Sequence, residues 1–177
     1  MTRPPVRADD LVRAIEFDPE VVAALVADAR PFLAPWLPWA VEEYTVDSAA
    51  AFLLEAAAGW AAGTSFCYLI APGGEPIGAC ALERRIGPTG LEIGYWLHPA
   101  HTGRGHVSRA VATLLRLAGD LDDVDHVEIR HDAANHASRA VPERLGFTLV
   151  DAEERRAPAA PAETGVGMVW RIAVRPG

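Results

Sequence analysis

The sequence predicts an α/β (α+β) fold in which a mixed, mostly antiparallel sheet of about seven strands is flanked by about four helices. Two observations lead to it. The chain has 177 residues, 50% of them hydrophobic and 23% charged, which is typical of a folded protein with one sizeable core. In its middle, three strand-like runs follow one another across Gly/Pro turns, and helical and strand-like segments alternate after them. We expect residues 1–177 to form a single domain.

The first third of the chain predicts one strand and two helices. Residues 11–17 alternate weakly between apolar and polar and predict the strand. Asp-Pro-Glu at residues 18–20 marks the start of a helix, which ends at a corner rich in proline and tryptophan, residues 34–39. A second helix is expected from a cap at residues 47–48 to Gly63.

The rest of the chain predicts a meander followed by alternating elements. Because the three strand-like runs are joined by short Gly/Pro turns, we expect neighbouring strands to be antiparallel. The expected elements are strands at 64–71, 76–85 and 91–97, a helix at 105–117, a strand at 124–130, a helix at 138–145, and strands at 147–152 and 168–174.

The formal net charge is −8, and the chain contains no lysine and a single asparagine. Because phosphate backbones and anionic lipids favour basic surfaces, this charge disfavours a nucleic-acid or membrane partner and suits an amine-bearing one. Cys67 and Cys80 lack metal-binding spacing and are expected as buried free thiols, which favours a reducing compartment. The apolar stretch at 49–63 is too short to span a bilayer, so we expect a cytoplasmic protein. The histidines have no ligand spacing, and no metal is expected.

The segment from Leu91 to Ala110 carries the chemistry. A strand ends at Leu97, and a short loop with Gly103 and Gly105 leads directly into a helix. Glycines let a backbone approach a ligand closely, and the free N–H groups of a first helical turn attract anions. Three arginines and no acid lie between residues 101 and 116. The sequence therefore predicts a phosphate-bearing ligand, in a loop that matches neither a Walker A nor a Rossmann motif.

Several ordered motifs resemble the GNAT superfamily of N-acetyltransferases. Thr-Gly-Arg-Gly-His-Val at residues 102–107 resembles its coenzyme A motif, Arg/Gln-x-x-Gly-x-Gly/Ala. Residues 135–147 are similar to the Asn-x-x-Ser...Leu-Gly-Phe signature of its RimJ/RimL-like ribosomal-protein branch. Residues 36–39 and 92–97 also look like that branch, and the resemblance extends from about residue 6 to 174. It implies the GNAT fold and acetyl-CoA as co-substrate.

The resemblance also implies a set of coenzyme-binding residues. The pyrophosphate would lie on backbone N–H groups of residues 103–108, and the pantetheine would run along the strand that ends at Leu97, whose N–H is the candidate oxyanion donor. Thr102 and Val107 depart from the motif, which implies a lower coenzyme affinity. The single asparagine would either hold the pantetheine amide or cap the helix after it. The expected coenzyme-binding residues are Leu97, Thr102, Gly103, Arg104, Gly105, His106, Val107, Ser108 and Asn135.

Two groups are needed for proton transfer. Glu92 corresponds to a general base of the family, although it could instead pair with an arginine across the strands. Glu42, Glu43 and His98 are competing bases.

The family's usual tyrosine acid corresponds to Pro142 here. Ser138 could protonate the sulfur in its place, or it could be a helix cap. Trp36 and Trp39 would wall the acceptor site or pack under the sheet.

The sequence therefore predicts an acetyl-CoA-dependent N-acetyltransferase in which a primary amine attacks the thioester directly in a ternary complex. The acceptor would be a protein N-terminal α-amine or a small-molecule amine, such as an aminoacyl nucleotide or an antibiotic. One alternative is a non-catalytic acyl-CoA-binding or sensor module of the same fold, and another is a nucleotide-binding α/β domain. Monomer and homodimer are both compatible with the sequence.

Overall fold

The Gly/Pro turns in the middle of the chain fold it into the expected antiparallel meander. The computed structural model describes residues 3–154 and 157–174. In the meander Tyr68 faces Cys80 on the next strand, and Cys80 faces Tyr95 on the one after it. The three strands are β3 (Ser65–Ile70), β4 (Gly78–Glu83) and β5 (Gly90–Leu97).

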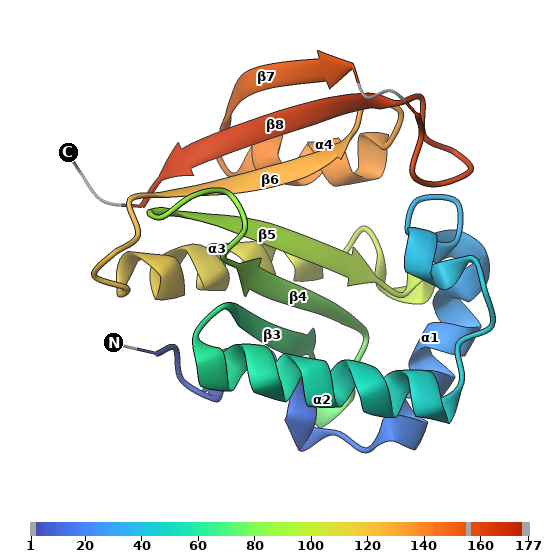
Figure 1. Ribbon diagram of the computed structural model, residues 1–177. Coiled ribbons are helices and arrows are strands. Elements are labelled where there is room, and N and C mark those ends of the chain that lie inside the picture. Colours follow the sequence, from blue (N-terminus) through green and yellow to red (C-terminus); the bar gives the residue numbers. More distant parts are fainter. Residues whose placement is uncertain (1–2, 155–156, 175–177) are drawn as a thin grey trace.

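The described residues contain eight strands in one sheet, ordered β1-β2-β3-β4-β5-β6-β8-β7 (Figure 1). The predicted strand at 11–17 is wrong after residue 13, because residues 14–16 form a 3₁₀ turn. The strand that is present, residues 11–13, pairs with an additional two-residue strand at residues 7–8. The other strands are β1 (Arg7–Ala8), β2 (Leu11–Arg13), β6 (His126–Asp132), β7 (Thr148–Glu154) and β8 (Val166–Ala173).

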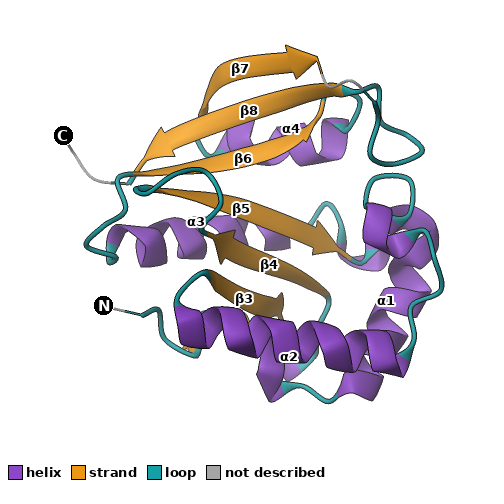
Figure 2. Ribbon diagram, viewed as in Figure 1, coloured by secondary structure: helices purple, strands orange, loops and turns teal. Residues whose placement is uncertain are grey.

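Helices cover both faces of the sheet, as expected for this order of elements. Figure 2 shows α2 in front of the sheet beside α1, while α3 and α4 lie behind it. Pro31 lies inside the last turns of the first helix rather than ending it. The helices are α1 (Pro19–Leu33), α2 (Val46–Ala62), α3 (His106–Gly119) and α4 (His136–Arg144). In the described part of the chain, none of them is long and apolar enough to cross a membrane.

The starts of the first two helices differ in detail from the expectation. Asp18 stands at the N-cap of α1, but its side chain makes no capping hydrogen bond. Thr45, not the predicted pair at 47–48, caps α2: its Oγ1 accepts from Ser48 N at 3.2 Å and Thr45 N donates back to Ser48 Oγ at 3.3 Å. This reciprocal capping box satisfies two donors of the first turn. Gly63 ends α2 in the left-handed conformation, as predicted.

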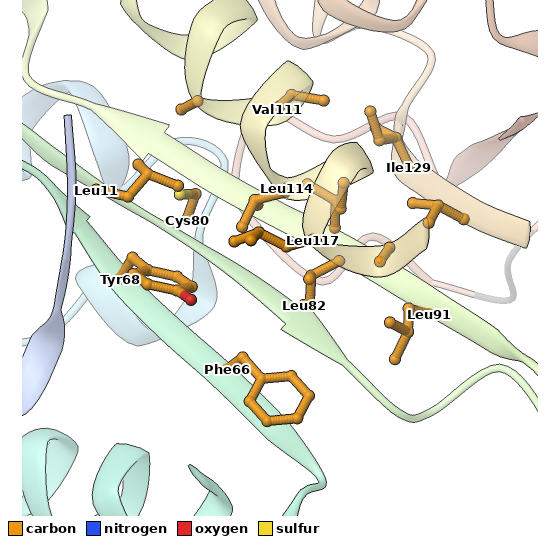
Figure 3. Packing of buried hydrophobic residues seen from close by; sticks show 14 of the residues in the cluster. Leu11, Phe66, Tyr68, Cys80, Leu82, Leu91, Val111, Leu114, Leu117 and Ile129 are labelled. Atoms are coloured by element: carbon orange, nitrogen blue, oxygen red, sulfur yellow. The ribbon is translucent and has the colours of Figure 1, made fainter. Parts of the chain in front are cut away.

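The main hydrophobic core lies between the sheet and α3. Figure 3 shows Val111, Leu114 and Leu117 of α3 directed toward the strands that carry Leu82 and Leu91. A second buried cluster lies on the opposite face, under α1 and α2. Both cysteines are buried free thiols, as predicted, and burial raises their pKa values, that of Cys67 to about 12.

The sheet opens between β5 and β6, its one parallel pair among the described strands. The two strands pair only from Gly90↔His126 to Glu92↔Glu128 and then diverge, as Figure 1 shows. His98 N donates to Ile77 O at 2.8 Å, on the β4 side. Because donors alternate along a strand, the N–H groups of Tyr95 and Leu97 point into the gap.

Candidate functional site

The gap between β5 and β6 holds a cavity of about 550 Å³. Its walls come from six parts of the chain: the corner after α1, the loop after β4, the two diverging strands, the start of α4 and the loop between β7 and β8. Ala162 N donates to Pro35 O at 2.8 Å and so joins that last loop to the corner. The polar or aromatic side chains in the walls are Trp36, Arg85, Glu92, Tyr95, Arg130, His131, Asp132, Asn135, Ser138 and Glu163.

The glycine loop before α3 has the geometry of an anion cradle. Gly103 and Gly105 have φ values of 74° and 75°, the left-handed region that glycine adopts without strain. A Cβ atom on Gly103 would meet nothing within 4 Å, so the loop surface is open. Gly105 caps α3 without a side-chain bond, and the first intrahelical bond runs from Arg109 N to Gly105 O. The N–H groups of residues 106–108 precede that bond and remain for a ligand.

Three arginines, Arg104, Arg109 and Arg144, lie in or next to the loop and the first turn of α3. The Arg109 guanidinium folds back on the loop, donating to Arg104 O at 3.0 Å and lying 2.9 Å from His106 Nδ1. Desolvation and the neighbouring arginine lower the pKa of His106. Arg144, at the far end of α4, donates to Ser108 Oγ at 3.0 Å. The start of α3 is therefore a locally positive surface on an acidic protein.

The two departures from the coenzyme motif have ordinary structural explanations. Thr102 Oγ1 donates to Pro99 O at 2.9 Å and closes the turn ahead of the loop. The Val107 side chain is partly buried and packs against the main core, so it is directed at the sheet. This position argues against a lower coenzyme affinity caused by the Val107 side chain.

Asn135 and Ser138 meet at the start of α4. Asn135 Oδ1 accepts from Ser138 N at 3.0 Å, so Asn135 is the cap and Ser138 is not. The Asn135 side-chain N–H₂ group has no hydrogen-bond partner among the described residues and lies in the cavity wall. The Tyr95 hydroxyl donates to Ser138 O at 2.9 Å and lies 3.1 Å from Ser138 Oγ. Burial raises the pKa of Tyr95 to about 12.

Glu92 lies in the cavity wall as the partner of an arginine. Its Oε1 accepts from Arg85 Nη2 at 2.6 Å, and its Oε2 is 3.8 Å from Arg130 Nε. The side chain is only 12% exposed. The ion pair that the sequence left open as the alternative for Glu92 is therefore present, with one carboxylate oxygen more loosely held than the other.

Asp132 and His131 are committed to the protein itself. Asp132 accepts four hydrogen bonds, from the backbone N–H groups of Ala134, Thr164 and Gly165 and from Thr164 Oγ1, at 2.8–3.0 Å. These bonds outweigh burial and lower its pKa to about 2. His131 Nδ1 lies 2.7 Å from Asp132 O, and its Nε2 accepts from Trp170 Nε1 at 2.9 Å. Burial lowers the pKa of His131, whose two nitrogens are both occupied.

The two tryptophans of the corner have different positions. Trp36 lies in the cavity wall, as the acceptor-site prediction requires. Trp39 packs edge-on against Tyr44 and tilted against Trp96, with centroid distances of 5.8 and 6.2 Å, and is not among the lining residues. Only Trp36 is therefore placed to meet a molecule in the cavity.

The competing bases lie elsewhere. Glu42 and Glu43 are exposed and outside the cavity wall. His98 Nε2 pairs with Asp28 at 2.7 Å, and its Nδ1 accepts from Ala100 N at 3.2 Å, so both ring nitrogens are engaged. Among the residues that the structure describes, no group of three or more His, Cys, Asp or Glu side chains could hold a metal ion.

Sequence reasoning missed five side chains of this site. Arg144 reaches the first turn of α3 from α4, and Arg85, Arg130 and Glu163 enter the cavity wall from three separate segments. No local pattern marks them, because each depends on how distant segments pack. Tyr95 was also missed, although Pro142 gave a signal for a donor at this place. A proline has no N–H for the carbonyl four residues earlier, which is that of Ser138, so another group has to donate to that carbonyl.

The sequence matches known acetyltransferases. A family model described as an acetyltransferase (GNAT) domain matches residues 3–148. The Bacillus subtilis (strain 168) protein YdaF, named "Putative ribosomal N-acetyltransferase", is 39% identical over 56 residues, which are 32% of this chain and 31% of that protein. The matched stretch thus covers about a third of the length of this curated relative.

Solved structures match over most of the chain. RimL, the ribosomal L7/L12 alpha-N-protein acetyltransferase in complex with coenzyme A, is 22% identical with a TM-score of 0.85, covering 97% of this chain and 98% of that one. The microcin C7 self-immunity acetyltransferase MccE, in complex with acetyl-CoA and AMP, is 19% identical with a TM-score of 0.81, covering 92% and 91%. Mycobacterium smegmatis RimJ, in complex with a CoA-disulfide, is 22% identical with a TM-score of 0.79, covering 88% and 77%. At these identities the similarity shows a common fold.

Proposed function

Because the chain belongs to the acetyltransferase (GNAT) family, we propose that it transfers an acetyl group from acetyl-CoA to a primary amine in a ternary complex. The observation that carries this proposal is the presence of two features that an acetyl-CoA-dependent transferase needs. The open, positive start of α3 suits a pyrophosphate, and the gap between β5 and β6 holds a cavity lined by Ser138 and Glu92.

The coenzyme would be held mainly by the backbone. The free N–H groups of residues 106–108 and the dipole of α3 would bind the pyrophosphate, with Arg104, Arg109 and Arg144 adding positive charge. The outward N–H group of Tyr95 would pair with the pantetheine along β5, and that of Leu97 would stabilise the oxyanion. Asn135 would offer its free N–H₂ group to a pantetheine amide while its oxygen caps α4.

The reaction needs a base that takes a proton from the attacking nitrogen and a donor that stabilises the departing sulfur. The nitrogen lone pair attacks the thioester carbon, the C–S bond breaks and its electron pair moves to the sulfur. Glu92 would take the proton that the nitrogen loses, directly or through water, with its looser oxygen Oε2. Ser138 would donate a hydrogen bond to the sulfur as its negative charge develops. One proton leaves the nitrogen and one reaches the thiolate, so no further reactant is required.

The first candidate acceptor is a protein N-terminal α-amine. Several of the similar proteins are named as ribosomal or ribosomal-protein acetyltransferases, which supports it. A small-molecule amine is the second candidate, because the MccE complex contains AMP and Trp36 offers an aromatic face in the cavity wall. A cytoplasmic location agrees with either acceptor.

The test is acetylation of an amine library that contains N-terminal peptides, aminoacyl nucleotides and aminoglycosides, with release of free thiol as the readout. We expect turnover with at least one class, and Glu92→Gln should lower kcat while the Kd for coenzyme A stays within about twofold. Tight binding of coenzyme A without thiol release from any amine would favour the alternative, a non-catalytic sensor of acyl-CoA. Equal affinity for coenzyme A and for a nucleotide that lacks pantetheine would favour a nucleotide-binding domain.

A further inference from the structure

Helix α4 contains a carbonyl group that its own backbone cannot satisfy. In an α-helix the carbonyl of residue i accepts from the N–H of residue i+4. Four residues after Ser138 the chain has Pro142, which lies inside α4 and has no N–H. The Ser138 carbonyl is left without its helical donor, beside the cavity.

The Tyr95 hydroxyl fills that place from the other side of the gap. It donates to Ser138 O at 2.9 Å, and the Tyr95 hydroxyl oxygen also lies 3.1 Å from Ser138 Oγ. Tyr95 stands on the half of β5 that has left β6, so this contact bridges the two diverging sides of the sheet. Both residues line the cavity. One phenol therefore satisfies the helix backbone and touches the side chain proposed to face the sulfur.

We propose that Tyr95 is the positioning residue of Ser138, holding the serine hydroxyl so that its hydrogen can point at the thioester sulfur. The role rests on the proposed function. A hydroxyl offers one donor and two acceptor sites, so the pair can exist in two arrangements. With no anion nearby, Ser138 O–H donates to the tyrosine oxygen while Tyr95 donates to the carbonyl. When negative charge develops on the sulfur, the serine hydrogen turns to it and Tyr95 donates to Ser138 Oγ, which strengthens the serine as a donor.

Tyr95 acts as a hydrogen-bond donor and does not give up its proton. Its pKa is raised to about 12 by burial, against about 8.5 for an ordinary thiol. A thiolate is therefore too weak a base to take the tyrosine proton. The proton that the sulfur finally accepts comes from the amine by way of the base and water.

The decisive variants are Tyr95→Phe, Ser138→Ala and the double variant, measured with the acceptor that gives turnover. We expect Tyr95→Phe to lower kcat about 10- to 100-fold, the effect of misorienting one catalytic group, with the Kd for coenzyme A within about twofold. Because both residues act through one hydroxyl, the double variant should be no slower than Ser138→Ala alone. A value of kcat for Tyr95→Phe within twofold of the wild type, or losses that multiply in the double variant, would overturn the role.

Tyr68 supplies a matched control. Its hydroxyl is also in the main core and donates to a backbone carbonyl, Pro5 O, at 2.8 Å, but it lies away from the gap. Tyr68→Phe should lower the melting temperature and leave kcat unchanged. If both phenylalanine variants lowered kcat equally, Tyr95 would be acting through general stability, and the proposal would be wrong.

Pro142→Ala separates the two hydrogen bonds of Tyr95. The alanine supplies the missing N–H to the Ser138 carbonyl, so in that background Tyr95→Phe should cost less stability but the same loss of kcat. A loss of kcat that disappears with Pro142→Ala would show that only the helix bond matters and would overturn the role. A wild type that binds coenzyme A without turnover overturns the proposed function and this role together, whereas an active wild type with an unaffected Tyr95→Phe overturns this role alone.

Discussion

The two helices that begin beside the gap satisfy their first turns in opposite ways. α3 begins at Gly105, which brings no side chain to the turn and leaves the N–H groups of residues 106–108 ahead of the first intrahelical bond. α4 begins at Asn135, whose side chain occupies Ser138 N, and the turn before it is held by Asp132. The start of α3 keeps its backbone N–H donors for an anion, and the start of α4 uses a backbone N–H donor in a hydrogen bond within the chain. Loss of donors at the start of α3 should therefore change binding, and loss of the side-chain oxygens that occupy the N–H groups at the start of α4 should change stability.

The largest effect is expected at Asp132. In Asp132→Asn the amide nitrogen takes the place of an oxygen that now accepts from a backbone N–H, so a donor faces a donor. We expect a loss of about 2–3 kcal/mol in the free energy of unfolding at pH 7, measured by denaturant titration.

This loss should depend on pH in a defined direction. The pKa of Asp132 falls from 3.8 to about 2 on folding, so its contribution is complete above about pH 5 and disappears as the pH falls through 4 toward 2. The difference between wild type and Asp132→Asn should therefore shrink across that range. A difference that is constant from pH 7 to pH 2 would contradict the assigned hydrogen bonds.

The next effect is expected at Arg144, which serves the open start of α3 from a distance. Arg144→Ala removes the guanidinium beside Ser108 and should weaken coenzyme A binding about 5- to 10-fold, more at low salt than at high salt. Isothermal titration calorimetry at two ionic strengths measures this change.

Arg139 is the matched control on the same helix, because its partner is the exposed Glu143 at 2.8 Å. Arg139→Ala should leave the coenzyme affinity unchanged. Equal losses for the two variants would mean that the overall charge of α4 matters and that no specific contact does.

The smallest effect comes from Asn135, where cap and ligand contact can be separated. Asn135→Ala removes the cap and should cost about 1 kcal/mol, or roughly 2–4 °C in melting temperature. Asn135→Asp keeps the capping oxygen and loses only the free N–H₂ group, so it should keep the melting temperature and weaken coenzyme A binding. Unchanged binding in both variants would make Asn135 a cap only.

The fold could be predicted to a large extent because its signals are local. Glycine and proline residues mark the turns of the meander, and the spacing of apolar residues in the long helix determines which face of it is buried. The first strand failed at residue 14 because its weak alternation could not show that the chain turns there. The cap of α2 was missed by two residues because Thr45, Asp47 and Ser48 are all good capping residues, and only the backbone geometry selects among them.

The candidate site divides in the same way. The glycine loop was predicted because one short segment makes it, whereas the roles of Glu92 and Asn135 stayed open until their partners were seen. The sequence allowed either an ion pair or a base role for Glu92. The structure places Arg85 beside it, so the ion pair is present. Val107 departs from the coenzyme motif, and its place on the first turn of α3 directs its side chain to the core.

The sequence by itself determined the order of the elements, the acidic surface and the backbone cradle at the start of α3, because these depend on residues that are neighbours in the chain. The tertiary structure alone decided which side chains meet in the gap. Tyr95 and Ser138 are 43 residues apart, and Arg144 and Ser108 are 36. Such pairs depend on where β5 leaves β6 and how α4 packs beside them. A local pattern fixes backbone conformation, but it does not fix the distance between two segments that only the folded core brings together.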